Sequence, residues 1–131
     1  MKKTYFKRQE KRKSVSKIVH IGNGAGFSGD RFDAAQALVQ HLKSCDGPRY
    51  LMFEVLAERT IASAQRAKAA NPDAGFSPYL DHYVNDILAD IQQAGITLVS
   101  NLGAANPEAA ARRIHELACL VKLHYLLILT F

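Results

Sequence analysis

The sequence predicts an α/β fold, and two features of the chain carry that prediction. Short apolar, β-branched runs of strand length alternate with amphipathic or alanine-rich runs of helical length. This alternation is typical of a parallel sheet whose strands are joined by crossover helices. The first apolar run also stops at four glycines within residues 22–29, and an amphipathic stretch follows at once. We therefore expect a three-layer sandwich with a mostly parallel, Rossmann-like sheet and helices on both faces.

The first half of the chain is expected to supply two strands and two helices. The first strand is predicted at residues 18–21. A helix with Asp30 as its N-cap is predicted over residues 31–43, because apolar residues recur there at helical spacing. The almost wholly apolar run at residues 50–54 predicts a second strand that is covered on both faces. An alanine-rich helix follows and is expected to end at Ala70, before a proline.

The second half of the chain repeats the strand–loop–helix order. Ser77 is expected to cap a third helix, which ends at a left-handed C-cap on Gly95. A third strand is predicted at residues 96–99. Asn106, which is followed by proline and glutamate, is typical of the start of a fourth helix. The aromatic and β-branched end of the chain, residues 124–131, predicts a fourth strand.

The net charge of +5 comes from the N-terminal end of the chain. Residues 1–13 carry seven basic side chains and one acidic side chain, and the remaining residues have a net charge of −1. We expect residues 1–16 to form a disordered basic tail and residues 17–131 to form the α/β domain, with no specific nucleic-acid site. In the alternative interpretation, the tail recruits RNA or an acidic membrane surface through salt-dependent contacts.

Other classes of site have little support in the sequence. No apolar run approaches the ~20 residues that a membrane-spanning helix needs. Cys45 and Cys119 are interpreted as two reduced thiols in a cytoplasmic protein, and no histidine has the spacing of a metal ligand. The sequence therefore predicts no metal ligand, and it leaves the cofactor unknown.

Three loops are expected to meet at one edge of the sheet, because ligands of parallel sheets bind where the strands end. These loops are residues 22–30, 54–60 and 100–106. Glu58 and, behind it, Glu54 are the candidate acid–base residues. The candidate residues for binding a small anionic organic substrate are Gly22, Asn23, Gly24, Gly26, Phe27, Ser28, Gly29, Asp30, Arg31, Asn101, Gly103 and Asn106. The alternative for all of these positions is a structural role in turns, helix caps or a solvated surface.

The glycine loop also contains the spacing Gly24-x-Gly26-x-x-Gly29, which is formally a dinucleotide fingerprint between a strand and a helix. Asp30 at the start of the helix would compete with a bound phosphate, and this argues against NAD. An NAD(P)-dependent oxidoreductase therefore stays an alternative function. A non-enzymatic module that binds anions or serves as a scaffold is a third one.

Four segments together resemble the acyclic terpene utilisation (AtuA-like) family. They are IGNGAGFSGDRFDAA at residues 21–35, YLMFEVLAERTIA at 50–62, RAKAANPDAGFSP at 66–78 and SNLGAANPEAAA at 100–111. The resemblance covers residues 17–118, and it implies a cytoplasmic protein that acts in the catabolism of citronellol- or geraniol-type terpenes. The substrates implied are branched acids or their thioesters, and the reaction is unassigned.

The resemblance also implies an incomplete fold. Members of the family are much longer than this chain, so it corresponds to an N-terminal portion only, and the ending CLVKLHYLLILTF departs from the family pattern. A truncated or frameshifted reading frame would explain both departures, and a fragment of this kind would lack half of the active site and be inactive. An exposed sheet edge in such a fragment would favour association with a second copy or with a partner subunit.

Overall fold

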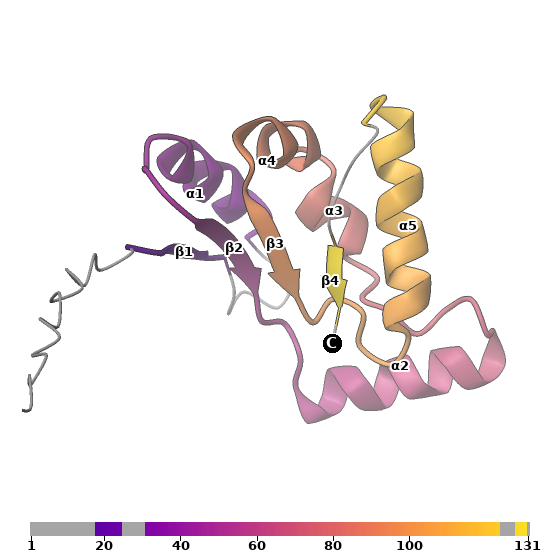
Figure 1. Ribbon diagram of the computed structural model, residues 1–131. Coiled ribbons are helices and arrows are strands. Elements are labelled where there is room, and N and C mark those ends of the chain that lie inside the picture. The colour runs from indigo at the N-terminus through magenta and orange to yellow at the C-terminus, as the bar shows by residue number, and fades with distance from the viewer. Residues whose placement is uncertain (1–17, 25–30, 124–127, 131) are drawn as a thin grey trace, which may run out of the picture.

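The computed structural model describes residues 18–24, 31–123 and 128–130. Within them, four strands form one sheet in the order β1-β2-β3-β4, and each neighbouring pair is parallel. Figure 1 shows the strands side by side, with α2 lying beyond their carboxyl ends. The prediction of an incomplete α/β sandwich with a parallel sheet is therefore confirmed. The predicted basic tail, residues 1–16, lies outside the described residues.

The elements follow one another in the expected order. The strands are β1 (His20–Asn23), β2 (Arg49–Phe53), β3 (Thr97–Ser100) and β4 (Ile128–Thr130). The helices are α1 (Ala34–Lys43), α2 (Glu58–Ala70), α3 (Leu80–Val84), α4 (Leu88–Ala94) and α5 (Pro107–Leu120). β1, β2 and β3 are shifted by one or two residues from their predicted positions, which is an ordinary uncertainty for element ends. β4 lies within the predicted residues 124–131, of which 124–127 and 131 lie outside the described residues.

The prediction of one continuous third helix from Ser77 is wrong. The segment forms two helices, α3 and α4, and the amide of Ile87 between them donates to the carbonyl of Val84, which makes a tighter turn. Asn85 and Asp86 at this break are weak helix formers. The hydroxyl of Ser77 accepts from the amide of Tyr79 instead of capping a helix. The predicted C-cap at Gly95 is confirmed, with φ of 64° in the left-handed region.

The first helix also begins later than predicted, at Ala34, with Asp33 in the N-cap position. Arg31 stays outside the helix, and its guanidinium forms an ion pair with Asp33 at 2.8 Å. The predicted cap, Asp30, lies outside the described residues.

One hydrophobic core joins the helices to one face of the sheet. Leu51, Phe53 and Leu98 are buried, and they belong to the same core as side chains of α1, α3, α4 and α5. The strand order follows the chain order, so right-handed crossovers bring successive helices to the same side of the sheet. Among the described helices, α1, α3, α4 and α5 therefore cover a single face, rather than the two faces that the sequence predicts, and α2 lies beyond the carboxyl ends of the strands.

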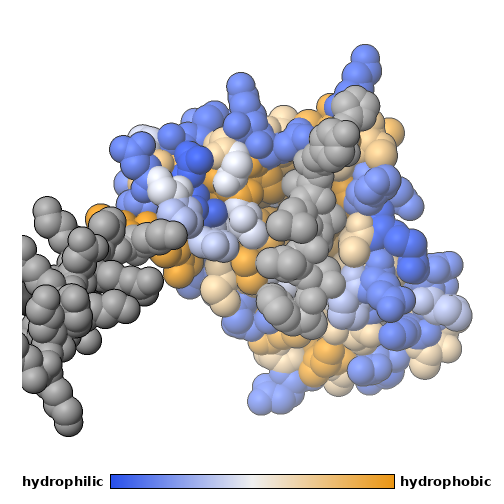
Figure 2. Space-filling model, viewed as in Figure 1, coloured by the Kyte–Doolittle hydropathy of each residue, from blue (hydrophilic) through white to orange (hydrophobic). Residues whose placement is uncertain are grey.

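The opposite face of the sheet is apolar and open within the described residues. Alternation along the strands brings Ile21, Met52 and Val99 to this face. Ile21 is 66% exposed and Met52 is 39% exposed. Figure 2 shows hydrophobic side chains on the side of the molecule seen in Figure 1. A parallel sheet is normally covered on both faces. In this protein the described helices cover only one face of the sheet.

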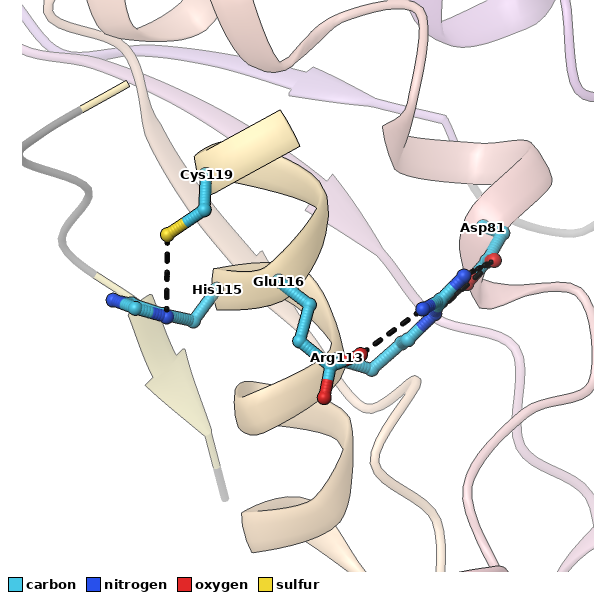
Figure 3. Close-up of polar contacts among 5 residues, drawn as sticks. All are labelled: Asp81, Arg113, His115, Glu116 and Cys119. Carbon is cyan, nitrogen blue, oxygen red and sulfur yellow. Dashed lines mark hydrogen bonds and ion pairs between the residues drawn. The ribbon is translucent and has the colours of Figure 1, made fainter. Parts of the chain in front are cut away.

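An ion pair ties the short helix α3 to α5. Nη2 of Arg113 lies 2.6 Å from Oδ2 of Asp81, and Nε of the same guanidinium donates to Oδ1 at 3.1 Å (Figure 3). This hydrogen bonding holds the pKa of Asp81 below its usual value of 3.8, against the opposing effect of burial. The hydrogen bonds that Arg113 donates to Asp81 and Glu116 raise the pKa of its guanidinium, which stays charged.

We expect Asp81→Asn to destabilise the protein at pH 7 by about 0.5–1 kcal/mol, a small value because both partners are partly exposed. A carboxyl with a lowered pKa contributes stability above its unfolded-state pKa, and this stability is lost as pH falls through the folded-state pKa. The difference from the unsubstituted protein should therefore be constant from pH 7 to 5 and should shrink below about pH 4. Urea unfolding at each pH measures it.

Asp73→Asn is the matched control. Asp73 pairs with Arg112 across 3.3 Å, but its side chain is 86% exposed. We expect its effect on the free energy of unfolding to be smaller than that of Asp81→Asn. An equal effect of the two substitutions, or one that persists unchanged at pH 3, would contradict the role of the Asp81–Arg113 pair.

Candidate functional site

The carboxyl ends of β2 and β3 are joined by a pair of polar side chains. Nδ2 of Asn101 donates to Oε1 of Glu54 at 3.0 Å, and the amide of Leu56 donates to the same oxygen at 3.1 Å. Oδ1 of Asn101 accepts from the amide of Val55 at 2.9 Å. Two predicted site residues from separate loops therefore meet, and each fixes the conformation of the other's loop.

Glu58, the other candidate acid–base residue, is the first residue of α2 and is exposed. The preceding turn is held by Thr60, whose hydroxyl accepts from the amide of Ala57 at 2.7 Å and donates to its carbonyl at 2.8 Å. An acidic side chain at this position is favourable to the helix dipole. Glu54 is thus held by hydrogen bonds to its carboxylate, whereas Glu58 is presented on a helix end.

The side chain of Asn106 has a structural role at the start of α5. Its amide nitrogen donates to the carbonyls of Pro72 and Ala74, at 2.8 Å each, and its Oδ1 accepts from the amide of Ala109 at 3.3 Å. The predicted N-cap is therefore confirmed. The side chain is 6% exposed and joins the loop after α2 to the start of α5. These bonds favour the structural interpretation of Asn106 over direct binding of a ligand.

Three of the candidate glycines lie where another group approaches the backbone closely. A Cβ on Gly24 would be 2.7 Å from the Phe53 ring, and one on Gly22 would be 3.2 Å from Leu42. A Cβ on Gly103 would be 2.7 Å from Cα of Pro107. These glycines allow the strands, helices and loops to pack closely. Their other role, as ligand-binding backbone, stays a prediction.

Two of the remaining candidates, Asn23 and Arg31, lie on either side of the glycine loop in the sequence. Asn23 is exposed at the end of β1, and Arg31 is exposed beyond the glycine loop. The hydrogen bond from Arg31 lowers the pKa of Asp33. Five candidates lie outside the described residues: Gly26, Phe27, Ser28, Gly29 and Asp30.

The structure adds an aromatic cluster beside the start of α1. The ring of Phe32 lies 5.1 Å from His82 and 5.7 Å from Tyr79, between ring centroids. A depression of about 330 Å³ is lined by Phe32 and His82 of this cluster and by four neighbouring side chains, which are Asp81, Asn85, Asp86 and Leu117. Only the position of Phe32, directly after the glycine loop, could have pointed to it, because its partners lie about fifty residues away in the sequence.

Two kinds of feature are absent from the part of the chain that the structure describes. No group of three or more histidine, cysteine, aspartate or glutamate side chains in this part of the chain is placed to hold a metal ion. No helix among the same residues is both long and apolar enough to cross a membrane.

The fold and this edge define an α/β protein with a parallel sheet. At the carboxyl ends of its strands, where parallel sheets usually bind ligands, a carboxylate is held by a neighbouring loop. A family model described as "Acyclic terpene utilisation family protein AtuA" matches residues 19–127. The chain belongs to this family, as the four sequence segments predicted. Comparison with curated proteins and with solved structures gave no match.

Proposed function

We propose that this protein acts in acyclic terpene utilisation by binding a branched terpenoid acid, free or as its thioester, at the carboxyl edge of the sheet. Family membership supports the terpene association. The observation that supports this site is the hydrogen bond that Asn101 donates to Glu54, because it holds a carboxylate at the position where parallel sheets bind ligands. A cytoplasmic location is part of the same proposal.

The proposed chemistry is acid–base catalysis by Glu54, with Glu58 as the second acid–base residue. Asn101 and the amide of Leu56 both bond to Oε1 of Glu54, and within the described residues Oε2 has no protein partner. Oε2 is therefore the oxygen that can exchange a proton with substrate. The half-buried side chains of Val55 and Leu56 follow directly and offer apolar contact to a branched chain.

The test has a binding and a chemical measurement. Citronellic acid, geranic acid and their coenzyme A thioesters are titrated into the protein by calorimetry, with NADH as a separate arm. The thioesters are then incubated with the protein in D₂O, and mass spectrometry follows deuterium incorporation next to the carbonyl. We expect saturable binding to the unsubstituted protein. Glu54→Gln should bind comparably, but its deuterium exchange should be slower by a factor of at least about 100, as for loss of an acid–base group.

Glu116→Gln is the matched control, because Glu116 is an exposed glutamate on α5 whose carboxylate pairs with Arg113. It should leave binding and exchange unchanged. Absence of binding by every acid and thioester would overturn the proposed substrate class. Saturable binding of NADH alone would favour the oxidoreductase alternative. Unchanged exchange in Glu54→Gln together with loss in Glu58→Gln would move the acid–base role to Glu58.

A further inference from the structure

Both cysteines of this chain lie four residues after a histidine, as His41/Cys45 and His115/Cys119. Residues at this spacing on a helix are neighbours on one face. His115 and Cys119 lie within α5, and both are exposed. Sγ of Cys119 is 3.7 Å from Nδ1 of His115, and Figure 3 shows the two side chains pointing toward each other. They form a pair of metal-ligand type on an accessible helix surface.

The separation of the two atoms fits one tetrahedral metal ion. With a Zn–S bond of about 2.3 Å and a Zn–N bond of about 2.05 Å, a tetrahedral angle places sulfur and nitrogen about 3.5 Å apart. The observed 3.7 Å is close to this value, so both atoms could bind one ion with little movement. The sequence prediction of no metal ligand considered the histidines and the cysteines separately, whereas the spacing of four residues between a histidine and a cysteine is a mixed pattern.

We propose that His115 and Cys119 are half of a site for a thiophilic divalent metal ion of the Zn²⁺ class, completed by the same pair of a second copy of this chain. The pair needs completion because the described residues hold no third ligand beside it, and a structural zinc ion takes four. Two pairs supply two thiolates and two neutral imidazoles. Each thiol releases its proton to the buffer, and the two thiolates balance the charge of the ion.

The surface beside the pair suits contact with a second copy. Leu120 is 76% exposed and Val121 is 44% exposed, and both directly follow Cys119. Burial of these apolar side chains between two copies would stabilise the dimer around a shared ion. The metal would therefore join two copies where the surface is already apolar.

The other pair of the chain is less suited and provides a control. Cys45 follows the end of α1, is half-buried, and its thiol donates to the carbonyl of His41 at 3.6 Å. Its Sγ lies 3.9 Å from Nε2 of His41. Binding a metal there would require the thiol to leave its carbonyl partner, so we assign the site to α5.

The test uses Co²⁺ as a spectroscopic probe and Zn²⁺ as its competitor, with the reduced full chain. We expect the intense visible bands of tetrahedral cobalt and a thiolate charge-transfer band, which saturate at one ion per two chains and disappear when Zn²⁺ is added. Light scattering should show the mass doubling with metal and returning to its starting value with a chelator. Cys119→Ser and His115→Ala should lose both effects, and Cys45→Ser should keep them.

Three results would overturn the proposal. One is an unchanged cobalt spectrum in Cys119→Ser, and another is loss of the spectrum in Cys45→Ser alone. The third is binding of one ion per chain without a change in mass, which would show that a second copy does not complete the site. Far-UV circular dichroism of each variant checks that these exposed substitutions leave the fold intact.

Discussion

Replacing Phe53 with alanine should destabilise the protein by about 3–5 kcal/mol, the usual cost of removing a buried aromatic ring. Phe53 is the last residue of β2 and is 1% exposed. Its ring lies 5.1 Å from that of Tyr83, between centroids, and it occupies the space that Gly24 leaves open. Truncation would remove contacts to the helix layer and to the end of β1 together. Urea unfolding followed by circular dichroism measures the effect.

The control for this substitution is its neighbour. Met52 is on the opposite face of the same strand and is 39% exposed. We expect Met52→Ala to cost less than about 1 kcal/mol, because little buried volume is lost. The contrast between two adjacent residues tests directly whether one face of the sheet carries the core. Comparable losses of stability for the two variants would contradict the one-sided packing described for residues 18–24, 31–123 and 128–130.

Replacing Asn106 with alanine should destabilise the protein by about 2–4 kcal/mol, from the loss of a helix cap and of partners for two carbonyls. The cap bond to the amide of Ala109 is local. The bonds to Pro72 and Ala74 connect segments more than thirty residues apart. Because the side chain is buried, water cannot readily replace it. The midpoint of urea unfolding should fall with little change in the slope.

Asn71→Ala is the matched control for Asn106→Ala. Asn71 is exposed, and its side chain accepts one bond, from the amide of Asp73 at 3.0 Å. We expect a loss of less than about 1 kcal/mol, because water can satisfy the exposed amide. Asn106→Asp separates the contributions further. It keeps the capping oxygen but removes the amide donors, so its stability should still be reduced. Full stability of Asn106→Ala would show that the loop after α2 does not depend on this residue.

The elements of the fold could be predicted because their signals are local. The apolar run around Leu51, the Asn106-Pro107 pair and Gly95 each specify a strand, a helix start or a helix end within a few residues. The break between α3 and α4 was not predicted, because the apolar stripe runs through it without interruption. There the weak helix propensity of Asn85 and Asp86 competes with a continuous hydrophobic pattern.

The candidate site could be predicted only as a set of loops. Parallel strands bring the residues after β2 and β3 to one edge, and this placed Glu54 and Asn101 in neighbouring loops. Their hydrogen bond joins residues forty-seven positions apart, and no local pattern specifies it. The same limit holds for Gly24: its spacing suggests a ligand loop, whereas the ring that packs against it comes from β2.

The sequence by itself determined the α/β class, the order of the elements and the family of this protein, because hydrophobic periodicity, caps and motifs are properties of short segments. Only the tertiary structure decided which face of the sheet is covered, which side chains meet at its carboxyl edge and which glycines serve packing. These depend on strand order and on contacts between distant segments. Because crossovers are right-handed, it is the strand order that decides which face the helices cover. The strand order and the closeness of each approach are fixed when the chain packs, and neighbouring residues do not encode them.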